Sequence, residues 1–362
     1  MTKSEKMERF DKMLKSINND KRFASESGEK LLAKLSDRPL NVNTIDSGSL
    51  VLNQILGGGL AEGRIIEIYG PESSGKTSIA LTAVGNVQKK GGTAVFIDTE
   101  NALDPKYAKK LGVDLDDLAV AQPGNAEQAL QLIIDLTNSG VVDVIVLDSV
   151  AALVPEAELN GDAGDHTIGL IARLLSKNLR KLVKPANETK TTIIFINQTR
   201  DAIGQFSPMG TPQTTTGGKA LKFYASQRIE VKKGMPIKGD KADEKIGVEV
   251  KFKIVKNKVA PPFGTGSSVL SFNKGINVPA EMMEVGPAYG VIDRPNNRTY
   301  LEANTGEIIG KSKAEALERL NSDEDLMKRL SEALANKISN NLYEEADSKA
   351  NDVEEKEEAP EE

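Results

Sequence analysis

Four nearly continuous apolar segments recur along the first two hundred residues and predict buried β-strands. They read RIIEIYG, TAVFIDTE, VDVIVLDS and TTIIFINQ, at residues 64–70, 93–100, 142–149 and 191–198. Each is rich in Ile, Val or Phe and lacks the strict apolar–polar alternation of a half-exposed strand. Because helix-like segments lie between them, we expect a mostly parallel, twisted sheet with helices on both faces.

All four segments end in small or polar residues. In an open α/β sheet the ligand lies outside the carboxyl ends of the parallel strands, so these residues are expected to share one rim. The rim residues are Gly70, Asp98, Glu100, Asp148, Ser149, Asn197 and Gln198.

The pattern changes on both sides of these strands. Apolar residues at three- and four-residue spacing predict an amphipathic helix between residues 4 and 19, which packs on its own core or docks on a neighbouring subunit. Residues 226–234 and 246–263 alternate apolar with charged side chains, which is typical of antiparallel edge strands. After residue 277, short strands and two helical segments predict a small α+β domain.

These changes divide the chain into four predicted parts. They are an amino-terminal helix and linker at 1–38, a core with two long loops at 39–276, the small α+β domain at 277–342, and an acidic disordered tail at 343–362.

Composition narrows the chemistry. The 362 residues include no Cys and a single His, His166, which excludes a Cys/His zinc site, disulfides and thiol catalysis. No segment approaches the ~20 apolar residues of a membrane span, so we expect no membrane partner and a cytoplasmic location. Residues 343–362 hold ten acidic residues and two lysines; the whole chain carries −6, so the rest carries +2. This tail is a solubilising segment or an acidic decoy that competes with a polyanion for a basic surface.

The octet GPESSGKT, from Gly70 to Thr77, matches the phosphate-binding loop G-x-x-x-x-G-K-[ST]. Its glycines let backbone N–H groups close around phosphates, and the following helix presents its positive end. The match follows a predicted strand and opens a predicted helix, which indicates an α/β P-loop NTPase core that binds ATP with Mg²⁺. The expected nucleotide-binding residues of this loop are Gly70, Pro71, Glu72, Ser73, Ser74, Gly75, Lys76, Thr77 and Ser78.

The rim supplies partners for this loop. Lys76 is expected to reach the β- and γ-phosphates, and Thr77 to place its hydroxyl on Mg²⁺, which Asp148 holds through water. Glu100 could orient and deprotonate the attacking water, although Asp98 competes for that role. The amide of Gln198 could sense the γ-phosphate without the repulsion that a further carboxylate would bring.

Two long polar segments, at 159–183 and 199–226, follow the strands that end at Asp148 and Gln198. Loops of this length inside a compact domain are usually functional or disordered. The first leads into a helix whose cations suit a phosphate backbone, or form a solvated face. These cations are Arg173, Lys177, Arg180, Lys181 and Lys184.

Several longer strings carry a resemblance to a known family. EIYGPESSGKT, ALDPKYAKKLGVD, VDVIVLDSVAALVP, IIFINQ, TTTGGKALKFYAS and VKNKVAPPF together resemble the bacterial RecA recombinase family over about residues 39–276. The resemblance implies a DNA-dependent ATPase that forms filaments on single-stranded DNA, pairs it with homologous double-stranded DNA and exchanges strands. It also implies that the filament promotes self-cleavage of SOS-type repressors.

The same resemblance assigns roles to individual residues. It implies Glu100 as the base, Gln198 as the γ-phosphate sensor, and Asp104 with Tyr107 as adenine contacts. Lys256 and Lys258 would reach the ATP of an adjacent protomer, as catalytic cations. The implied protomer-interface residues are Lys222 and Phe223, and the implied DNA-binding residues are Ile168, Arg173, Ser176, Arg180, Arg200, Ile203, Gly217 and Gly218.

Some alternatives stay open. The second long segment contains GQFSPMGTPQ, so Phe206 and Met209 compete with Ile203 as the apolar residue wedged between bases. A hexameric helicase-type motor would share the phosphate loop, but the amino-terminal helix and KALKFYAS disfavour it. A nucleotide-gated DNA-binding scaffold without turnover is disfavoured by Glu100, Lys256 and Lys258.

Overall fold

The computed structural model describes residues 1–23, 31–34, 42–161, 169–201, 213–239 and 244–357, with side chains described no further than residue 340. The chain forms two compact units, Met1–Asn43 and Thr44–Glu362. In the first unit, α1 (Lys3–Asn18) begins with a capping box between Thr2 and Glu5, and η1 (Lys21–Phe23) follows. The helix predicted at residues 4–19 is therefore present.

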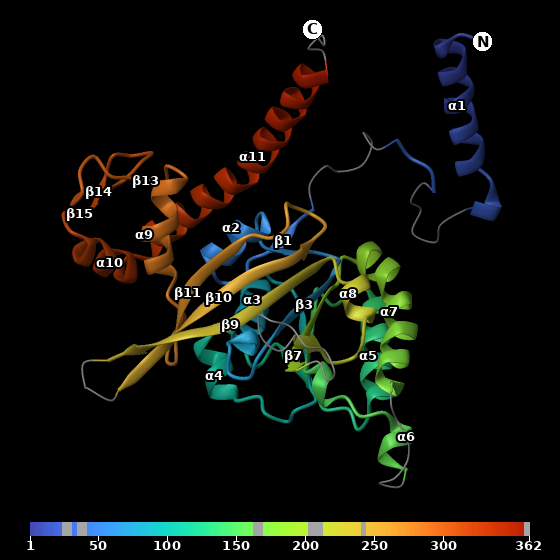
Figure 1. Ribbon diagram of the computed structural model, residues 1–362, viewed down its shortest axis with the longest axis horizontal. Coiled ribbons are helices and arrows are strands. Elements are labelled where there is room, and N and C mark those ends of the chain that lie inside the picture. The colour runs from blue at the N-terminus through green and yellow to red at the C-terminus, as the bar shows by residue number, and fades with distance from the viewer. Residues whose placement is uncertain (24–30, 35–41, 162–168, 202–212, 240–243, 358–362) are drawn as a thin grey trace. The chain divides into compact units, whose positions relative to one another are not determined.

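A ten-stranded sheet forms the centre of the second unit (Figure 1). Its strand order is β12-β11-β10-β9-β3-β7-β6-β4-β5, with β8 paired to β7. A separate two-stranded sheet joins β1 (Thr44–Ile45) to β2 (Leu60–Ala61). The strands of the large sheet are β3 (Ile65–Gly70), β4 (Ala94–Asp98), β5 (Leu118–Ala121), β6 (Val144–Asp148), β7 (Thr192–Asp201), β8 (Gln213–Thr215), β9 (Gln227–Lys238), β10 (Lys245–Asn257), β11 (Thr265–Ser271) and β12 (Gly275–Ile276).

The four predicted strands are β3, β4, β6 and β7, and they pair in parallel, which confirms the predicted fold class. The prediction of antiparallel edge strands at residues 226–234 and 246–263 was only partly right. β10 is antiparallel to both of its neighbours, β9 and β11, but it lies inside the sheet. β9 pairs antiparallel with β10 but parallel with β3, and it lies inside the sheet rather than at its edge. The alternating pattern misled because β10, β11 and β12 extend the sheet beyond it as antiparallel strands.

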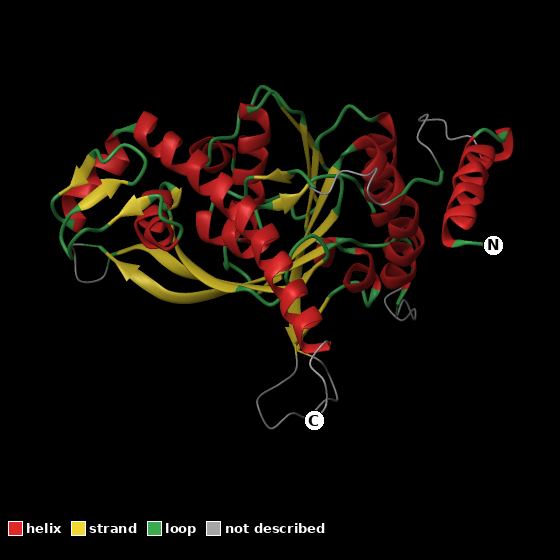
Figure 2. Cartoon of the chain, turned by 90° about the horizontal axis from the view of Figure 1, so that it is seen from above, coloured by secondary structure: helices red, strands yellow, loops and turns green. Residues whose placement is uncertain are grey.

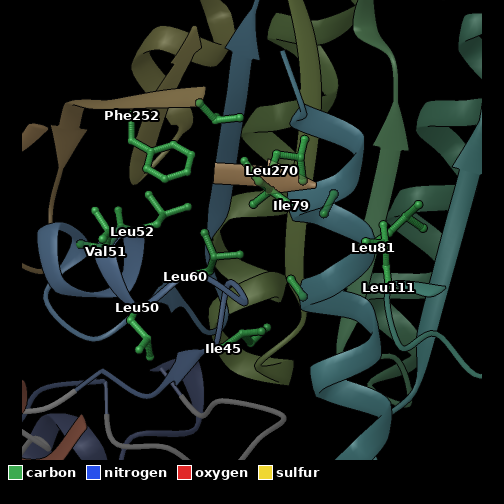
Figure 3. Close-up of a cluster of buried hydrophobic side chains, with 14 of the residues drawn as sticks. Ile45, Leu50, Val51, Leu52, Leu60, Ile79, Leu81, Leu111, Phe252 and Leu270 are labelled. Atoms are coloured by element: carbon green, nitrogen blue, oxygen red, sulfur yellow. The ribbon is translucent and has the colours of Figure 1, made fainter. Parts of the chain in front are cut away.

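Both faces of β3, β4 and β6, and of β7 from Thr192 to Asn197, are buried, as their continuous apolar sequences require. Alternate residues enter two cores: Ile66 and Ile68 belong to one, and Ile65 to the other. Figure 3 shows the first core, where α2 and α3 meet β10 and β11. Figure 2 shows helices on both sides of the strands. The helices of this region are α2 (Leu50–Leu56), α3 (Lys76–Lys89), α4 (Pro105–Lys110), α5 (Ala126–Ser139), η3 (Val150–Ala152), α6 (Glu156–Leu159), α7 (Leu170–Thr189) and α8 (Ala220–Tyr224).

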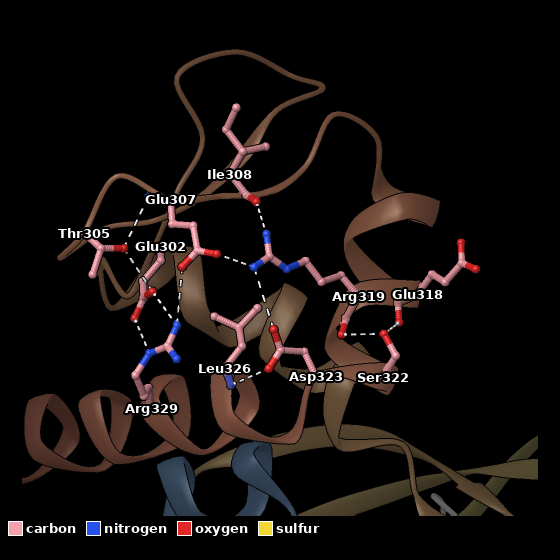
Figure 4. A network of polar contacts seen from close by, with 10 residues as sticks. All are labelled: Glu302, Thr305, Glu307, Ile308, Glu318, Arg319, Ser322, Asp323, Leu326 and Arg329. Carbon is pink, nitrogen blue, oxygen red and sulfur yellow. Dashed lines mark hydrogen bonds and ion pairs between the residues drawn. The ribbon is translucent and has the colours of Figure 1, made fainter.

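The carboxy-terminal part contains a three-stranded antiparallel sheet and three helices. Ion pairs of Arg329 with Glu302 (3.1 Å) and Glu307 (3.5 Å) tie the sheet to the last helix (Figure 4). The buried Glu281 accepts hydrogen bonds from Ser49 Oγ (2.6 Å) and Leu50 N (2.5 Å) at the start of α2. The elements are α9 (Val278–Ala288), β13 (Ile292–Asp293), β14 (Tyr300–Glu302), β15 (Ile308–Gly310), α10 (Lys313–Ser322) and α11 (Glu324–Glu357).

This carboxy-terminal part shares its apolar core with α2 and α3, and it falls in the same compact unit as the large sheet. The predicted boundaries at residues 38, 276 and 342 therefore stay predictions. The backbone of α11 continues as helix to Glu357, within the segment that the sequence predicts as an acidic disordered tail. Glu, Ala and Lys, which are frequent there, are strong helix formers.

Candidate nucleotide and DNA site

The phosphate-binding loop connects the end of β3 to the start of α3. Gly75 is the N-cap of α3 and has a left-handed φ of 92°. This backbone conformation favours glycine, and a Cβ atom there would in addition lie 2.8 Å from Leu270 Cδ2, so that the leucine side chain would have to move. Lys76 is buried, and its Nζ donates to the carbonyl oxygens of Gly70 (3.1 Å) and Pro71 (2.7 Å). The lysine thus lies folded into its own loop, at the positive end of α3.

The loop fits a polyphosphate. Burial lowers the pKa of Lys76, while the nearby carboxylates of Asp148, Glu100 and Glu72 raise it. Ser74 is fully buried, and among the described residues its hydroxyl has no hydrogen-bond partner. An unpaired buried hydroxyl beside a helix N-terminus and a lysine is the donor set that a phosphate oxygen would satisfy.

The residues expected to hold magnesium are in contact. Thr77 Oγ1 donates to Asp148 Oδ2 over 2.6 Å. The pKa of Asp148 is raised to about 6, mainly because the carboxyl is buried. The charges of Glu100 and Asp98 also raise this pKa, whereas the hydrogen bond from Thr77 and the charge of Lys76 lower it. A cation at this position would favour the charged carboxylate, and Mg²⁺ is usually bound by one or two such oxygens together with substrate phosphates.

Glu100 is held at the rim by two side chains. Its Oε1 accepts hydrogen bonds from Ser149 Oγ (2.5 Å) and from Gln198 Nε2 (3.1 Å). Glu100 is itself exposed, whereas Asp98 is buried and accepts from backbone N–H groups of the loop that follows β4. Of the two carboxylates that the sequence leaves open, Glu100 therefore has the freer oxygens and the contact with Gln198.

The two residues expected near the base of a nucleotide belong to α4 or its cap. Asp104 is the N-cap of α4 and accepts from Lys106 N over 2.8 Å. Tyr107 places its hydroxyl 2.8 Å from Ser78 Oγ, in the first turn of α3. Tyr107 therefore lies beside the phosphate loop, while the described contacts of Asp104 are those of a helix cap.

The structure brings most of the expected DNA-binding residues toward one helix. Arg173 and Arg180 are exposed on α7, Ser176 is half-buried between them, and Arg200 is exposed near the end of β7. A turn after β8 packs against α7 so closely that glycine is required. A Cβ on Gly217 would lie 2.4 Å from Leu175 Cδ1, and one on Gly218 would lie 2.9 Å from Ala172 Cβ.

Other predicted DNA contacts cannot be placed. Ile168 and Ile203 lie outside the described residues, as do His166, Phe206 and Met209.

The expected trans-acting cations are not near the phosphate loop of their own chain. Lys256 lies on β10 opposite Arg228 of β9, which in turn pairs with Glu67, three residues before the rim residue Gly70. Lys256 Nζ donates to the carbonyl oxygens of Lys222 and Phe223 over 2.8 Å each.

The lysines and the expected interface residues thus form one cluster at the end of α8. Lys258 is exposed beside this cluster, and the ring of Phe223 is 69% exposed.

The comparisons with known proteins agree with these motifs. The family model described as RecA N-terminal domain matches residues 9–277. The chain belongs to the RecA family. Protein RecA of Bacillus subtilis is 44% identical over 332 residues, which are 91% of this chain and 92% of that protein. Protein RecA of Thermus thermophilus is 46% identical over 314 residues (86% and 90%), and that of Bifidobacterium longum 48% over 309 residues (80% and 77%).

Membership of the RecA family supports a function in DNA recombination and repair, with binding of ATP and DNA. In general, the family consists of magnesium-dependent ATPases that act on DNA and self-assemble. Within the part of the chain that the structure describes, no helix is both long and apolar enough to cross a bilayer.

Sequence reasoning missed two features of this RecA family site. It placed Ser149 on the rim but gave it no role, although its hydroxyl holds Glu100. It also overlooked a buried ion pair between Glu67 and Arg228 behind the rim. The available signal was Glu67 itself, which is the single charged residue within the buried strand IIEIYG.

Proposed function

We propose that this RecA family member is a DNA-dependent ATPase that forms filaments on single-stranded DNA, pairs it with homologous duplex and exchanges strands. The observation that carries the proposal is the rim, where Glu100 is held between Ser149 and Gln198 beside a buried Lys76. A base and an amide sensor at the phosphate loop suit a reaction at a terminal phosphate.

Within one chain, each of these residues has its own proposed role in ATP hydrolysis. Bound MgATP supplies the γ-phosphoryl group that is transferred to water. Lys76 and the loop amides would bind its phosphates, and Thr77 and Asp148 would hold the Mg²⁺ that neutralises charge on those phosphates. Glu100 orients the water and accepts its proton. Gln198 then donates to phosphate oxygen instead of to Glu100, which ties the position of its strand to the nucleotide state.

The site is completed by a neighbouring protomer. Lys256 lies on β10, which β9 separates from the phosphate-loop strand β3, and Lys258 follows directly after β10. We assign both lysines to the ATP of an adjacent chain. A cation supplied in trans neutralises charge in the transition state, as an arginine finger does. Hydrolysis then depends on filament assembly. The exposed Phe223 and the half-exposed apolar side chains Met7, Phe10 and Met13 of α1 suit contacts between protomers.

DNA is bound along α7 and the glycine turn. Arg173, Arg180 and Arg200 are exposed cations that suit phosphates, and the turn at Gly217 and Gly218 packs tightly against α7, the helix that carries Arg173 and Arg180. Apolar residues of the two loops, Ile168 and Ile203, are proposed to wedge between bases. The filament is further proposed to promote self-cleavage of an SOS-type repressor.

Two assays test this function. ATP hydrolysis is measured with and without single-stranded DNA, and strand exchange is measured with homologous and heterologous duplexes. The proposal expects DNA-stimulated hydrolysis and exchange only with the homologous duplex. A helicase-type motor would unwind duplexes regardless of homology, and a DNA-binding scaffold would leave ATP intact, so either result overturns the proposal.

A further inference from the structure

A buried ion pair lies behind the rim, between β3 and β9. Arg228 Nε donates to Glu67 Oε2 over 2.5 Å, and the two side chains are 8% and 0% exposed. The guanidinium also lies over the ring of Tyr69, with its central carbon 4.6 Å from the ring centroid. A buried pair of this kind often contributes little to stability compared with apolar residues of the same size, so its presence calls for another reason.

The second oxygen of Glu67 holds an amide on the neighbouring strand. Glu67 Oε1 accepts from Asn197 Nδ2 over 3.0 Å. Asn197 is fully buried, and its side-chain amide makes two further hydrogen bonds. Its Nδ2 also donates to the carbonyl oxygen of Thr216 (2.9 Å), and its Oδ1 accepts from the backbone N–H of Gln198 (2.9 Å).

These contacts place the Asn197 amide between a residue proposed to contact ATP and a turn proposed to contact DNA. Gln198 is the proposed γ-phosphate sensor, and Thr216 directly precedes the turn at Gly217 and Gly218. The Asn197 amide has one orientation that satisfies Thr216 and Gln198 together. The Glu67 carboxylate favours this orientation because a carboxylate is only an acceptor and therefore pairs with the amide NH₂, not with the amide oxygen. Arg228 in turn holds the carboxylate in place.

We propose that Glu67, whose buried charge Arg228 balances, is a positioning residue that fixes the Asn197 amide, and that this amide couples DNA contact at the glycine turn to the γ-phosphate sensor Gln198. The inference rests on the proposed DNA-dependent ATPase. Its specific content is that an acceptor at position 67, not the ion pair as such, is needed for DNA to stimulate hydrolysis.

Two double variants separate these possibilities. Glu67→Leu/Arg228→Met removes both the ion pair and the acceptor for Asn197. Glu67→Gln/Arg228→Met removes the ion pair as well but keeps an amide oxygen for Asn197. The measured quantity is the ratio of ATP hydrolysis with single-stranded DNA to hydrolysis without it, and thermal unfolding confirms that both variants are folded.

In Glu67→Leu/Arg228→Met the stimulation ratio is expected to fall about tenfold, because this variant loses a hydrogen bond to a charged acceptor. The Gln/Met variant should keep the ratio within about twofold of the parent. Equal ratios in the two folded variants would overturn the inference while leaving the proposed function intact. A parent chain that DNA does not stimulate would overturn the proposed function, and the inference with it.

A substitution on the other side of the contact decides the question if a double variant does not fold. Asn197→Ala alone should lower the stimulation ratio about tenfold, which tests the coupling even where a double variant does not fold. Where Glu67→Leu/Arg228→Met does fold, adding Asn197→Ala to it should cause no further loss, because one amide carries the coupling. Losses that multiply in the triple variant, or an unchanged ratio in Asn197→Ala, would show that position 67 acts elsewhere.

Discussion

The buried carboxylate of Asp148 should lower the stability of the nucleotide-free chain, and replacing Asp148 with asparagine should restore that stability. The carboxylate is 8% exposed and lies near Glu100 and Asp98. Asp148→Asn keeps an oxygen that can accept the hydrogen bond from Thr77 and removes the buried charge. We therefore expect a more stable chain that no longer holds Mg²⁺ properly.

The magnitude follows from the pKa of this one group. Burial raises it from 3.8 to about 6. A rise of about two units corresponds to roughly 3 kcal/mol of unfolding free energy lost when the group is charged, at pH 7 and above. Because the folded chain binds the proton more tightly than the unfolded chain, this loss disappears as the pH falls through 6 toward 4. The gain from Asp148→Asn should therefore be full at pH 7.5 and vanish near pH 4.

The assay is thermal unfolding of parent and variant in EDTA, without nucleotide, at pH 7.5, 6, 5 and 4. The midpoint of Asp148→Asn should exceed that of the parent by several degrees at pH 7.5, and the difference should shrink as the pH falls. Asp117→Asn, which neutralises an exposed carboxylate, is the matched control and should shift the midpoint little. The reasoning is refuted if Asp148→Asn is no more stable than the parent at pH 7.5, or if its advantage grows on acidification.

Three further results are expected. Lys76→Ala should lower ATP turnover by at least a hundredfold while circular dichroism shows an intact fold; retained turnover would contradict the assignment of the phosphate loop. Lys256→Ala should also be inactive alone, but an equimolar mixture with Lys76→Ala should regain DNA-stimulated hydrolysis, since some interfaces then combine two intact residues; no recovery would argue against action in trans. Deleting residues 343–362 should strengthen duplex binding in a filter or anisotropy assay, and equal affinities would leave the tail a solubilising segment.

The sequence predicted the parts of the fold that depend on local pattern. The continuous apolar runs correctly predicted β3, β4, β6 and β7, because strands that are covered on both faces have apolar residues at successive positions. The rim followed from topology, since parallel strands share one carboxyl edge. The position of β9 did not follow, because an alternating pattern describes a strand's exposure and not which neighbour it pairs with.

The sequence also could not predict which side chains meet across the sheet. Glu100 and Ser149 stand at the ends of different strands, and only the register of β4 on β6 brings them within 2.5 Å. Likewise, Glu67 and Arg228 are 161 residues apart and meet because β3 pairs with β9. Long-range pairing of this kind leaves no periodic signal, so a charged residue in an apolar strand can be noticed but its partner cannot be named.

The strand β7 connects the proposed γ-phosphate sensor to the proposed DNA-contacting turn over a short distance. Gln198 stands at the rim, and Arg200 follows two residues later, about 7 Å along an extended strand. β8 pairs with the same stretch, Thr199 opposite Thr215, so the glycine turn begins two residues beyond that pair. A backbone shift of Gln198 toward a phosphate would therefore move the paired strand β8 as well. Coupling between the two ligands then needs no distributed pathway through the core, only two arrangements of one strand end.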